Sequence, residues 1–234
     1  MENEEQTPPE ATTGNRSRHP SSSDPIHRPK AVMSHRLFAG CPLPESAALR
    51  LHEWASEAFS SDDVRLVRPE QMHVTLLFYP KADSELRDRL VTLTAQVEWD
   101  PLHVKVGAVE RFSRSAIAVN LESADGDAAS LARLEHRLLR PFPEPAEDDP
   151  LACMLLALGE PEMDRFRRMH HHGTGLRPHL TVARARHGWK SSKMAPPPAL
   201  EFGLDRLVLF ESVPTPEGSA YTVLAQSGRP HPKP

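Results

Sequence analysis

Two stretches of the same pattern, His73-Val74-Thr75-Leu76 and His179-Leu180-Thr181-Val182, stand far apart in the chain. Each alternates a polar residue with an apolar one. Because successive side chains of a β-strand point to opposite faces, each stretch predicts a strand that buries its apolar pair and presents an imidazole beside a hydroxyl. The fold must therefore contain two such strands, and the pairs act together only if both polar faces meet in one cleft.

The pattern is specific only when all four positions are considered. With 13 histidines in 234 residues, chance predicts roughly 0.6 occurrences of His-x-Thr, a risk that every short motif carries. A third copy, His172-Gly173-Thr174, is indeed present. Only the first two stretches have apolar residues at the second and fourth positions, for which chance predicts roughly 0.1 occurrences. The alternative is two half-exposed strands that carry His and Thr by coincidence.

Metal binding by His73 and His179 is a second alternative. Zinc sites usually need a third protein ligand, and no acid or thiol recurs at the motif positions. We therefore expect no metal and no other cofactor. The run His170-His171-His172 predicts a surface loop, because three consecutive side chains on regular backbone cannot face one point.

The charge distribution favours an anionic ligand near the second motif. The net charge is −4, which argues against a general nucleic-acid coat protein because such proteins are usually strongly basic. The stretch from Pro161 to Lys193 differs, with eight Lys/Arg against two acids. Such a surplus suits a small anionic group or the end of a polynucleotide; the alternative is a solvated basic face.

Composition also indicates how the chain is divided. Residues 1–34 are polar and proline-rich, which predicts a disordered tail dispensable for chemistry, and residues 229–234 predict a flexible C-terminus. The globular domain is expected over residues 35–228. No secretory signal is recognisable, the longest apolar run (Leu151 to Leu158) is far short of a membrane span, and two cysteines make no disulfide framework. We expect a cytoplasmic monomer that does not enter a membrane.

Hydrophobic periodicity predicts alternating strands and helices. Strands are expected over residues 36–41, 64–67, 72–79, 102–112, 116–121, 179–184, 202–211 and 220–225, and helices from Pro44, after Asp83, around Leu131–Leu138 and over residues 162–169. Periodicity leaves Leu151–Leu158 open between strand and helix. Hairpin-length links between several strands favour an α+β fold with mostly antiparallel sheets.

Two imidazoles and two hydroxyls around a phosphate suit acid–base chemistry. An unperturbed imidazole titrates near pH 6.5 and serves as acid or base at neutral pH, so one can take a proton from water while the other protonates the departing oxygen. The hydroxyls can donate hydrogen bonds to the phosphoryl oxygens. Without an acidic metal cage the leaving group departs with proton help only, which fits a strained cyclic phosphodiester.

The chain resembles the 2H phosphoesterases, and most closely the RNA 2′,3′-cyclic phosphodiesterases, also called 2′-5′ RNA ligase-like proteins. The resemblance covers about residues 36 to 227. It rests on the following segments: Arg36-Leu37-Phe38, His73-Val74-Thr75-Leu76-Leu77-Phe78, Arg177-Pro178-His179-Leu180-Thr181-Val182-Ala183-Arg184, Leu207-Val208-Leu209-Phe210-Glu211-Ser212 and Tyr221-Thr222-Val223-Leu224.

The resemblance implies a bilobal, pseudo-symmetric α+β fold whose sheets line a central cleft, and metal-free hydrolysis of an RNA 2′,3′-cyclic phosphate end to a 2′-phosphate. It implies His73 as proton donor, His179 as proton acceptor, and Thr75 and Thr181 as phosphate ligands. Other 2H activities remain open, namely 2′-5′ RNA ligation or hydrolysis of a small cyclic nucleotide. So does a non-catalytic module that binds nucleotides or RNA ends.

Three further residues are candidates for substrate binding. In a regular strand Arg184 shares the face of Leu180 and Val182, so it reaches the phosphate only if the strand ends or bulges there. Phe38 and Phe78 can stack on a base, although a place in the core is the simpler expectation.

The sequence departs from the family pattern in three places: Tyr79-Pro80 after the first motif, a longer connection over residues 141–175 and the N-terminal tail. The longer connection can cover the cleft or narrow the choice of substrate.

Overall fold

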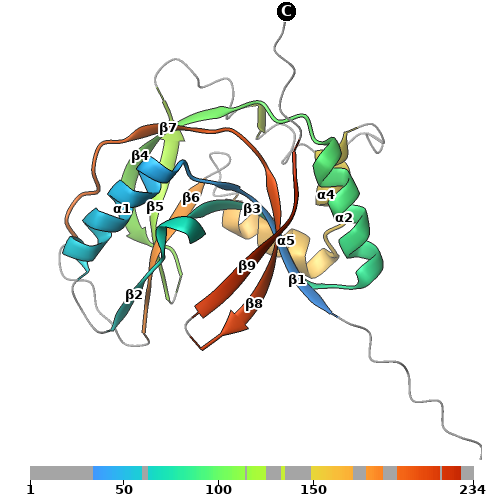
Figure 1. Ribbon diagram of the computed structural model, residues 1–234, viewed down its shortest axis with the longest axis horizontal. Coiled ribbons are helices and arrows are strands. Elements are labelled where there is room, and N and C mark those ends of the chain that lie inside the picture. Colours follow the sequence, from blue (N-terminus) through green and yellow to red (C-terminus); the bar gives the residue numbers. More distant parts are fainter. Residues whose placement is uncertain are drawn as a thin grey trace, which may run out of the picture. The chain divides into compact units, whose positions relative to one another are not determined.

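The computed structural model describes residues 34–59, 63–113, 115–124, 133–134, 149–170, 178–186, 194–216 and 218–227. The elements in chain order are β1 (His35–Pro42), α1 (Glu45–Ala58), β2 (Val64–Leu66), the 3₁₀ turn η1 (Pro69–Gln71), β3 (His73–Ala82), α2 (Ser84–Gln96), β4 (Leu102–Arg111), β5 (Ala116–Ser123), α4 (Pro150–Leu156), α5 (Glu160–His170), β6 (His179–Ala185), β7 (Glu201–Leu204), β8 (Val208–Thr215) and β9 (Gly218–Gln226) (Figure 1). The predicted C-terminal segment 229–234 and nearly all of the predicted tail lie outside the described residues.

One nine-stranded sheet forms the centre of the molecule. Its strand order is β7-β4-β5-β6-β3-β1-β8-β9, and β2 pairs additionally with β6. Every pairing is antiparallel. The two motif strands β3 and β6 are neighbours at the middle, joined through Val74 and Leu180. Apart from β2, four strands lie on each side of this junction, which confirms the expected antiparallel α+β fold and its pseudo-symmetric halves.

The helices form where capping and periodicity predict them. Asp83 caps α2, its carboxylate accepting a hydrogen bond from the Leu86 backbone N–H at 2.8 Å. The ambiguous segment Leu151–Leu158 is helical over α4, which begins with Asp149 as its N-cap and packs beside α2 (Figure 1). Of the helix predicted around Leu131–Leu138, only residues 133 and 134 belong to the described part, and both are helical.

The prediction of a single strand over residues 202–211 is wrong. The structure divides this segment into β7, which pairs with β4, and β8, which pairs with β1 on the other half of the sheet. Residues 205–207 cross between them, and Leu207 is fully buried at the crossing. The exposed pair Asp205-Arg206 interrupts the apolar residues at this crossing and is a sequence signal that separates the two strands.

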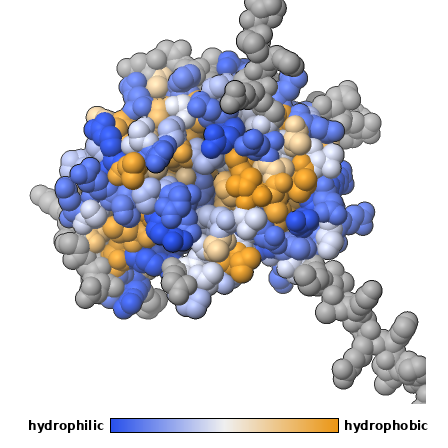
Figure 2. Space-filling model, in the orientation of Figure 1, coloured by the Kyte–Doolittle hydropathy of each residue, from blue (hydrophilic) through white to orange (hydrophobic). Residues whose placement is uncertain are grey.

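The described surface is mixed. On the face drawn in Figure 2, hydrophilic side chains predominate and are interrupted by smaller hydrophobic patches. Within the described residues, none of the helices combines the length and hydrophobicity that crossing a bilayer requires.

Candidate active site

The two motif pairs line the same cleft. His73, Thr75, His179 and Thr181 all line a cavity of about 370 Å³ and an adjoining one of about 300 Å³. This sharing follows from the sheet order, because β3 and β6 are adjacent and their polar faces point to the same side. The structure therefore brings together the four residues that the sequence pattern selected.

A β-bulge at the fourth motif position shapes β3. Gly40 and Ala39 of β1 pair with Thr75 and Leu77, which leaves Leu76 as the extra residue. Because a bulge shifts the alternation of faces by one residue, Phe78 joins His73 and Thr75 on the cleft side and lines the larger of the two cavities.

Strand β6 contains a β-bulge of the same kind. Ile117 and Ala118 of β5 pair with Ala183 and Thr181, so Val182, again at the fourth motif position, is the extra residue. Arg184 is thereby moved to the face of His179 and Thr181, and it lines both cavities. In a regular strand Arg184 would point away from the cleft. Strand β6 is not regular, because it bulges at Val182, and this bulge is the condition under which Arg184 was expected to face the site.

His73 is held in one orientation and kept neutral. Its Nδ1–H donates a hydrogen bond of 2.7 Å to the Gln71 carbonyl, which leaves the lone pair on Nε2. The pKa of His73 is lowered to about 4, first by burial of the ring and then by the charges of Arg184 and His179, while the hydrogen bond to Gln71 acts in the opposite direction. At neutral pH the His73 ring of the free protein is therefore an imidazole and not an imidazolium.

The ring of each motif histidine stacks on a phenylalanine. The ring of His73 stacks on Phe38 with 4.5 Å between centroids, and that of His179 stacks on Phe112 with 3.6 Å. His179 is also 7% exposed. Sequence reasoning did not select Phe112; its only signal was an aromatic residue at the end of a predicted strand. Stacking restricts both imidazoles to a narrow range of orientations.

The two candidate stacking residues differ in their surroundings. Phe38 is 4% exposed and packs against Phe210 and Tyr221 as well as His73, so it supports the site from within the core. Phe78 is more open, and the guanidinium groups of Arg36 and Arg165 each lie over its ring at 5.2 Å from the centroid. A cationic and aromatic wall results on this side of the cleft.

The long connection before the second motif reaches the cleft. Its described part contains α4 and α5, and Leu158, Glu162, Arg165 and Phe166 line the larger motif cavity. The Tyr79 hydroxyl donates a hydrogen bond of 2.6 Å to the Met154 carbonyl, which ties α4 to β3. Tyr79 thus anchors this connection to the strand of the first motif.

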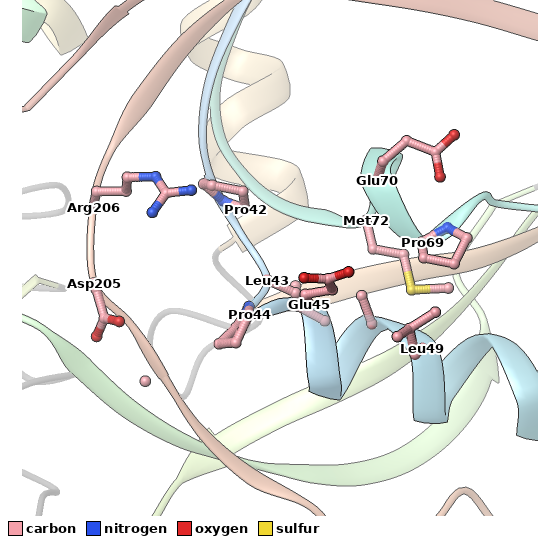
Figure 3. Close-up of a pocket in the computed structure, with 12 residues that line it drawn as sticks. Pro42, Leu43, Pro44, Glu45, Leu49, Pro69, Glu70, Met72, Asp205 and Arg206 are labelled. Atoms are coloured by element: carbon pink, nitrogen blue, oxygen red, sulfur yellow. The ribbon is translucent and has the colours of Figure 1, made fainter.

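A further cavity, of about 560 Å³, lies apart from the motifs. It is bounded by the start of α1, by η1 and by residues 203–206, and Glu45, Glu70, Asp205 and Arg206 are among its lining side chains (Figure 3). None of the four motif residues lines it. The chemistry of the histidine pair therefore belongs to the other two cavities.

Comparison with solved structures identifies the fold. The crystal structure of TT0787 from Thermus thermophilus is 24% identical and superposes with a TM-score of 0.59, covering 85% of this chain and all of that one. Escherichia coli LigT complexed with 3′-AMP is 20% identical, with a TM-score of 0.55 and coverage of 82% and 96%. No curated protein sequence gives a significant match.

An α+β fold whose antiparallel sheet carries two His-x-Thr pairs in one cleft defines a protein of the 2H phosphoesterase class. The sequence profile described as the 2′-5′ RNA ligase superfamily matches residues 43–213. The chain belongs to this superfamily.

Proposed function

We propose that the protein hydrolyses the 2′,3′-cyclic phosphate at an RNA end to a 2′-phosphate, by metal-independent acid–base catalysis. The observation that carries this proposal is that both His-x-Thr pairs line the same two cavities. Two imidazoles around one phosphate can supply the acid and the base that such a hydrolysis needs.

The reaction adds one water across one P–O bond. His179 takes a proton from the water as its oxygen attacks phosphorus. The bond from phosphorus to O3′ breaks, and His73 donates a proton to O3′, which leaves as the 3′-hydroxyl. The phosphate remains on O2′, and proton exchange with solvent restores both histidines.

The groups beside the histidines suit the charge of the transition state. The hydroxyls of Thr75 and Thr181 face the same cavities and would donate hydrogen bonds to the non-bridging oxygens. Arg184, brought to this face by the β6 bulge, would add positive charge where negative charge develops.

The acid role of His73 depends on the substrate. With a pKa of about 4 the ring is neutral in the empty cleft. An anionic phosphate placed beside it favours the imidazolium and raises the pKa. His73 therefore becomes an acid only when a phosphate is bound, which protects the proton from loss before the reaction.

The structural relatives support a nucleotide phosphate as ligand. Escherichia coli LigT, which shares the fold, has been crystallised with 3′-AMP, with ATP and with phosphate. The Arg184 side chain and the aromatic wall around Phe78 offer this chain the corresponding chemistry, a cation for phosphate and a ring surface for a base.

The decisive experiment uses an oligonucleotide with a 2′,3′-cyclic phosphate end, incubated with and without EDTA and analysed for a 2′-phosphate product. We expect equal product in both tubes. Absence of product in both tubes would refute hydrolysis and favour a binding module, and product that EDTA abolishes would refute the metal-independent mechanism. A second assay with a 5′-hydroxyl acceptor oligonucleotide reports 2′-5′ ligation.

Replacing either histidine should abolish turnover without unfolding the protein. We expect His73→Gln and His179→Gln each to lower kcat by about 10²–10⁴-fold, the usual contribution of a general acid or base. Circular dichroism and thermal melting check that the sheet persists. Turnover close to wild type in either variant would contradict the assigned roles.

A further inference from the structure

Two arginines face each other at the rim of the cleft. Arg65 on β2 lies directly opposite Arg184 on β6 in the antiparallel register, and both line the 300 Å³ cavity together with His73 and His179. Opposed residues on neighbouring antiparallel strands have Cα atoms about 5 Å apart. Like charges in this position repel each other, and a bound anion would relieve that repulsion.

No carboxylate of the described chain supplies that compensation. None of the residues that line this cavity is Asp or Glu. Among the ion pairs of the described residues, none includes Arg65 or Arg184. The two guanidinium groups are thus available to an external anion.

The β8–β9 hairpin leaves space for the Arg65 side chain at Gly218. Gly218 has φ of 139°, and a Cβ atom there would lie 3.2 Å from the Arg65 Nη1. The Gln71 side-chain amide donates a hydrogen bond of 2.6 Å to the Ser219 carbonyl, which fixes the hairpin beside η1. Arg65 therefore extends from β2 toward the other half of the sheet, across the mouth of the cavity.

The two cavities offer different chemistry on either side of the histidine pair. Beside the shared Arg184, the larger one has aromatic rings such as Phe78 together with the guanidinium groups of Arg36 and Arg165. The smaller one has Arg65, Arg68 and polar groups such as Gln71 and Ser219. Arg184 lines both cavities, whereas Arg65 lines only the smaller one. A phosphate held by Arg65 would therefore lie beside the phosphate at the histidine pair.

We propose that Arg65 forms a second phosphate subsite, which binds the internucleotide phosphate next to the reacting cyclic end, with Arg184 between the two phosphates. The inference rests on the proposed function and narrows it. The substrate is then an oligonucleotide of at least two nucleotides, and a cyclic mononucleotide lacks the anion that Arg65 recognises.

The test compares two substrates in wild type and in Arg65→Gln. One is a dinucleotide with a 2′,3′-cyclic phosphate, and the other is a nucleoside 2′,3′-cyclic phosphate without a 5′-phosphate. We expect wild type to prefer the dinucleotide in kcat/KM, and Arg65→Gln to lower this preference about tenfold to hundredfold, the scale of a charge-assisted hydrogen bond. Arg65→Lys should retain part of it, while Arg50→Gln, on the exposed face of α1, should leave the preference intact.

Three outcomes would refute the proposal that Arg65 binds a second phosphate. A wild-type protein without preference would do so, as would an Arg65→Gln variant that loses the same factor on both substrates or on neither. If wild type turns over neither substrate, the hydrolysis proposal fails, and the subsite is tested by binding alone. Calorimetry should then show a dinucleotide 2′-phosphate binding more tightly than a nucleoside 2′-phosphate, and Arg65→Gln should remove that difference; equal binding by wild type overturns the subsite.

Discussion

At the scale of single residues, the site is defined by how His73 is kept neutral. Its ring stacks on Phe38, donates from Nδ1 to the Gln71 carbonyl and lies near Arg184 and His179, both of which lower its pKa. Burial of the ring and the neighbouring charges are separate causes that both disfavour the imidazolium. A substitution can therefore change one of them and leave the other in place.

The charge of Arg184 can be removed without touching the ring. We expect Arg184→Gln to raise the pKa of His73 above its value of about 4, because a cation that opposes protonation is lost. The titration of the His73 ring followed by NMR measures this shift. Arg50→Gln removes the same charge from an exposed position on α1 and should leave the titration unchanged; an equal shift in both variants would contradict a local effect.

The pH dependence of turnover should differ between free and bound enzyme. As the proton donor, His73 must be protonated, so activity falls as the pH rises through its pKa. The profile of kcat/KM reports the free enzyme, in which this pKa is about 4, whereas that of kcat reports the complex, in which the phosphate anion raises it. We expect the alkaline limb of kcat to lie at higher pH than that of kcat/KM. Coincident limbs would refute the donor role.

At the scale of elements, the bulges at Leu76 and Val182 decide which side chains enter the cleft. The β3 bulge depends on Gly40 of β1, where a Cβ atom would lie 2.5 Å from the Val74 carbonyl oxygen and 3.3 Å from the Thr75 Cα. Both contacts are with backbone, which cannot rotate away. A small residue at this position is thus a requirement of the motif strand.

Gly40→Ala should destabilise the protein by about 1–3 kcal/mol, the usual cost of overpacking a core. Urea unfolding followed by circular dichroism measures it. The matched control is Gly159→Ala, whose Cβ would meet its nearest atom, Glu162 Oε2, at 3.5 Å. We expect no comparable loss there, and an equally stable Gly40→Ala protein would disprove the close approach of β1 to the bulge.

Helix α5, which belongs to the connection over residues 141–175, forms part of the wall of the larger motif cavity. Arg165 lies over Phe78 and lines the cavity, whereas Arg167, on the same helix, pairs with Asp164 at 3.6 Å on an exposed face. We expect Arg165→Ala to raise KM several-fold with little change in kcat, because it removes a binding group remote from the reacting bonds. Steady-state kinetics with the cyclic-phosphate oligonucleotide measures this. An equal effect of Arg167→Ala would point to net charge instead.

At the scale of the whole molecule, the sheet order joins the halves through β3 and β6. The buried core begins at Leu37 on β1, a strand that pairs with both β3 and β8. We expect deletion of residues 1–32 to leave stability and turnover unchanged. Deletion of residues 1–42 removes β1 and should prevent folding. Thermal melting and the cyclic-phosphate assay distinguish the two, and loss of turnover on the shorter deletion would assign the tail a role in chemistry.

The sequence by itself determined the local structure that depends on neighbours along the chain. Alternation in His73-Val74-Thr75 and His179-Leu180-Thr181 predicted both motif strands, and Asp83 marked the start of α2. These features follow from backbone geometry and capping, which act over a few residues. The segment over residues 202–211 shows the limit, because only the short polar pair Asp205-Arg206 separates two strands whose partners lie far away in the sequence.

Only the tertiary structure decided which residues meet. That Arg184 enters the cleft depends on a bulge at Val182, which is visible only in the pairing of β6 with β5. That Arg65 faces Arg184, and that Phe112 supports His179, likewise depends on strand register and not on spacing. The physical reason is that a β-sheet joins segments of any separation in sequence, and one extra residue in a strand reverses the face of every residue after it.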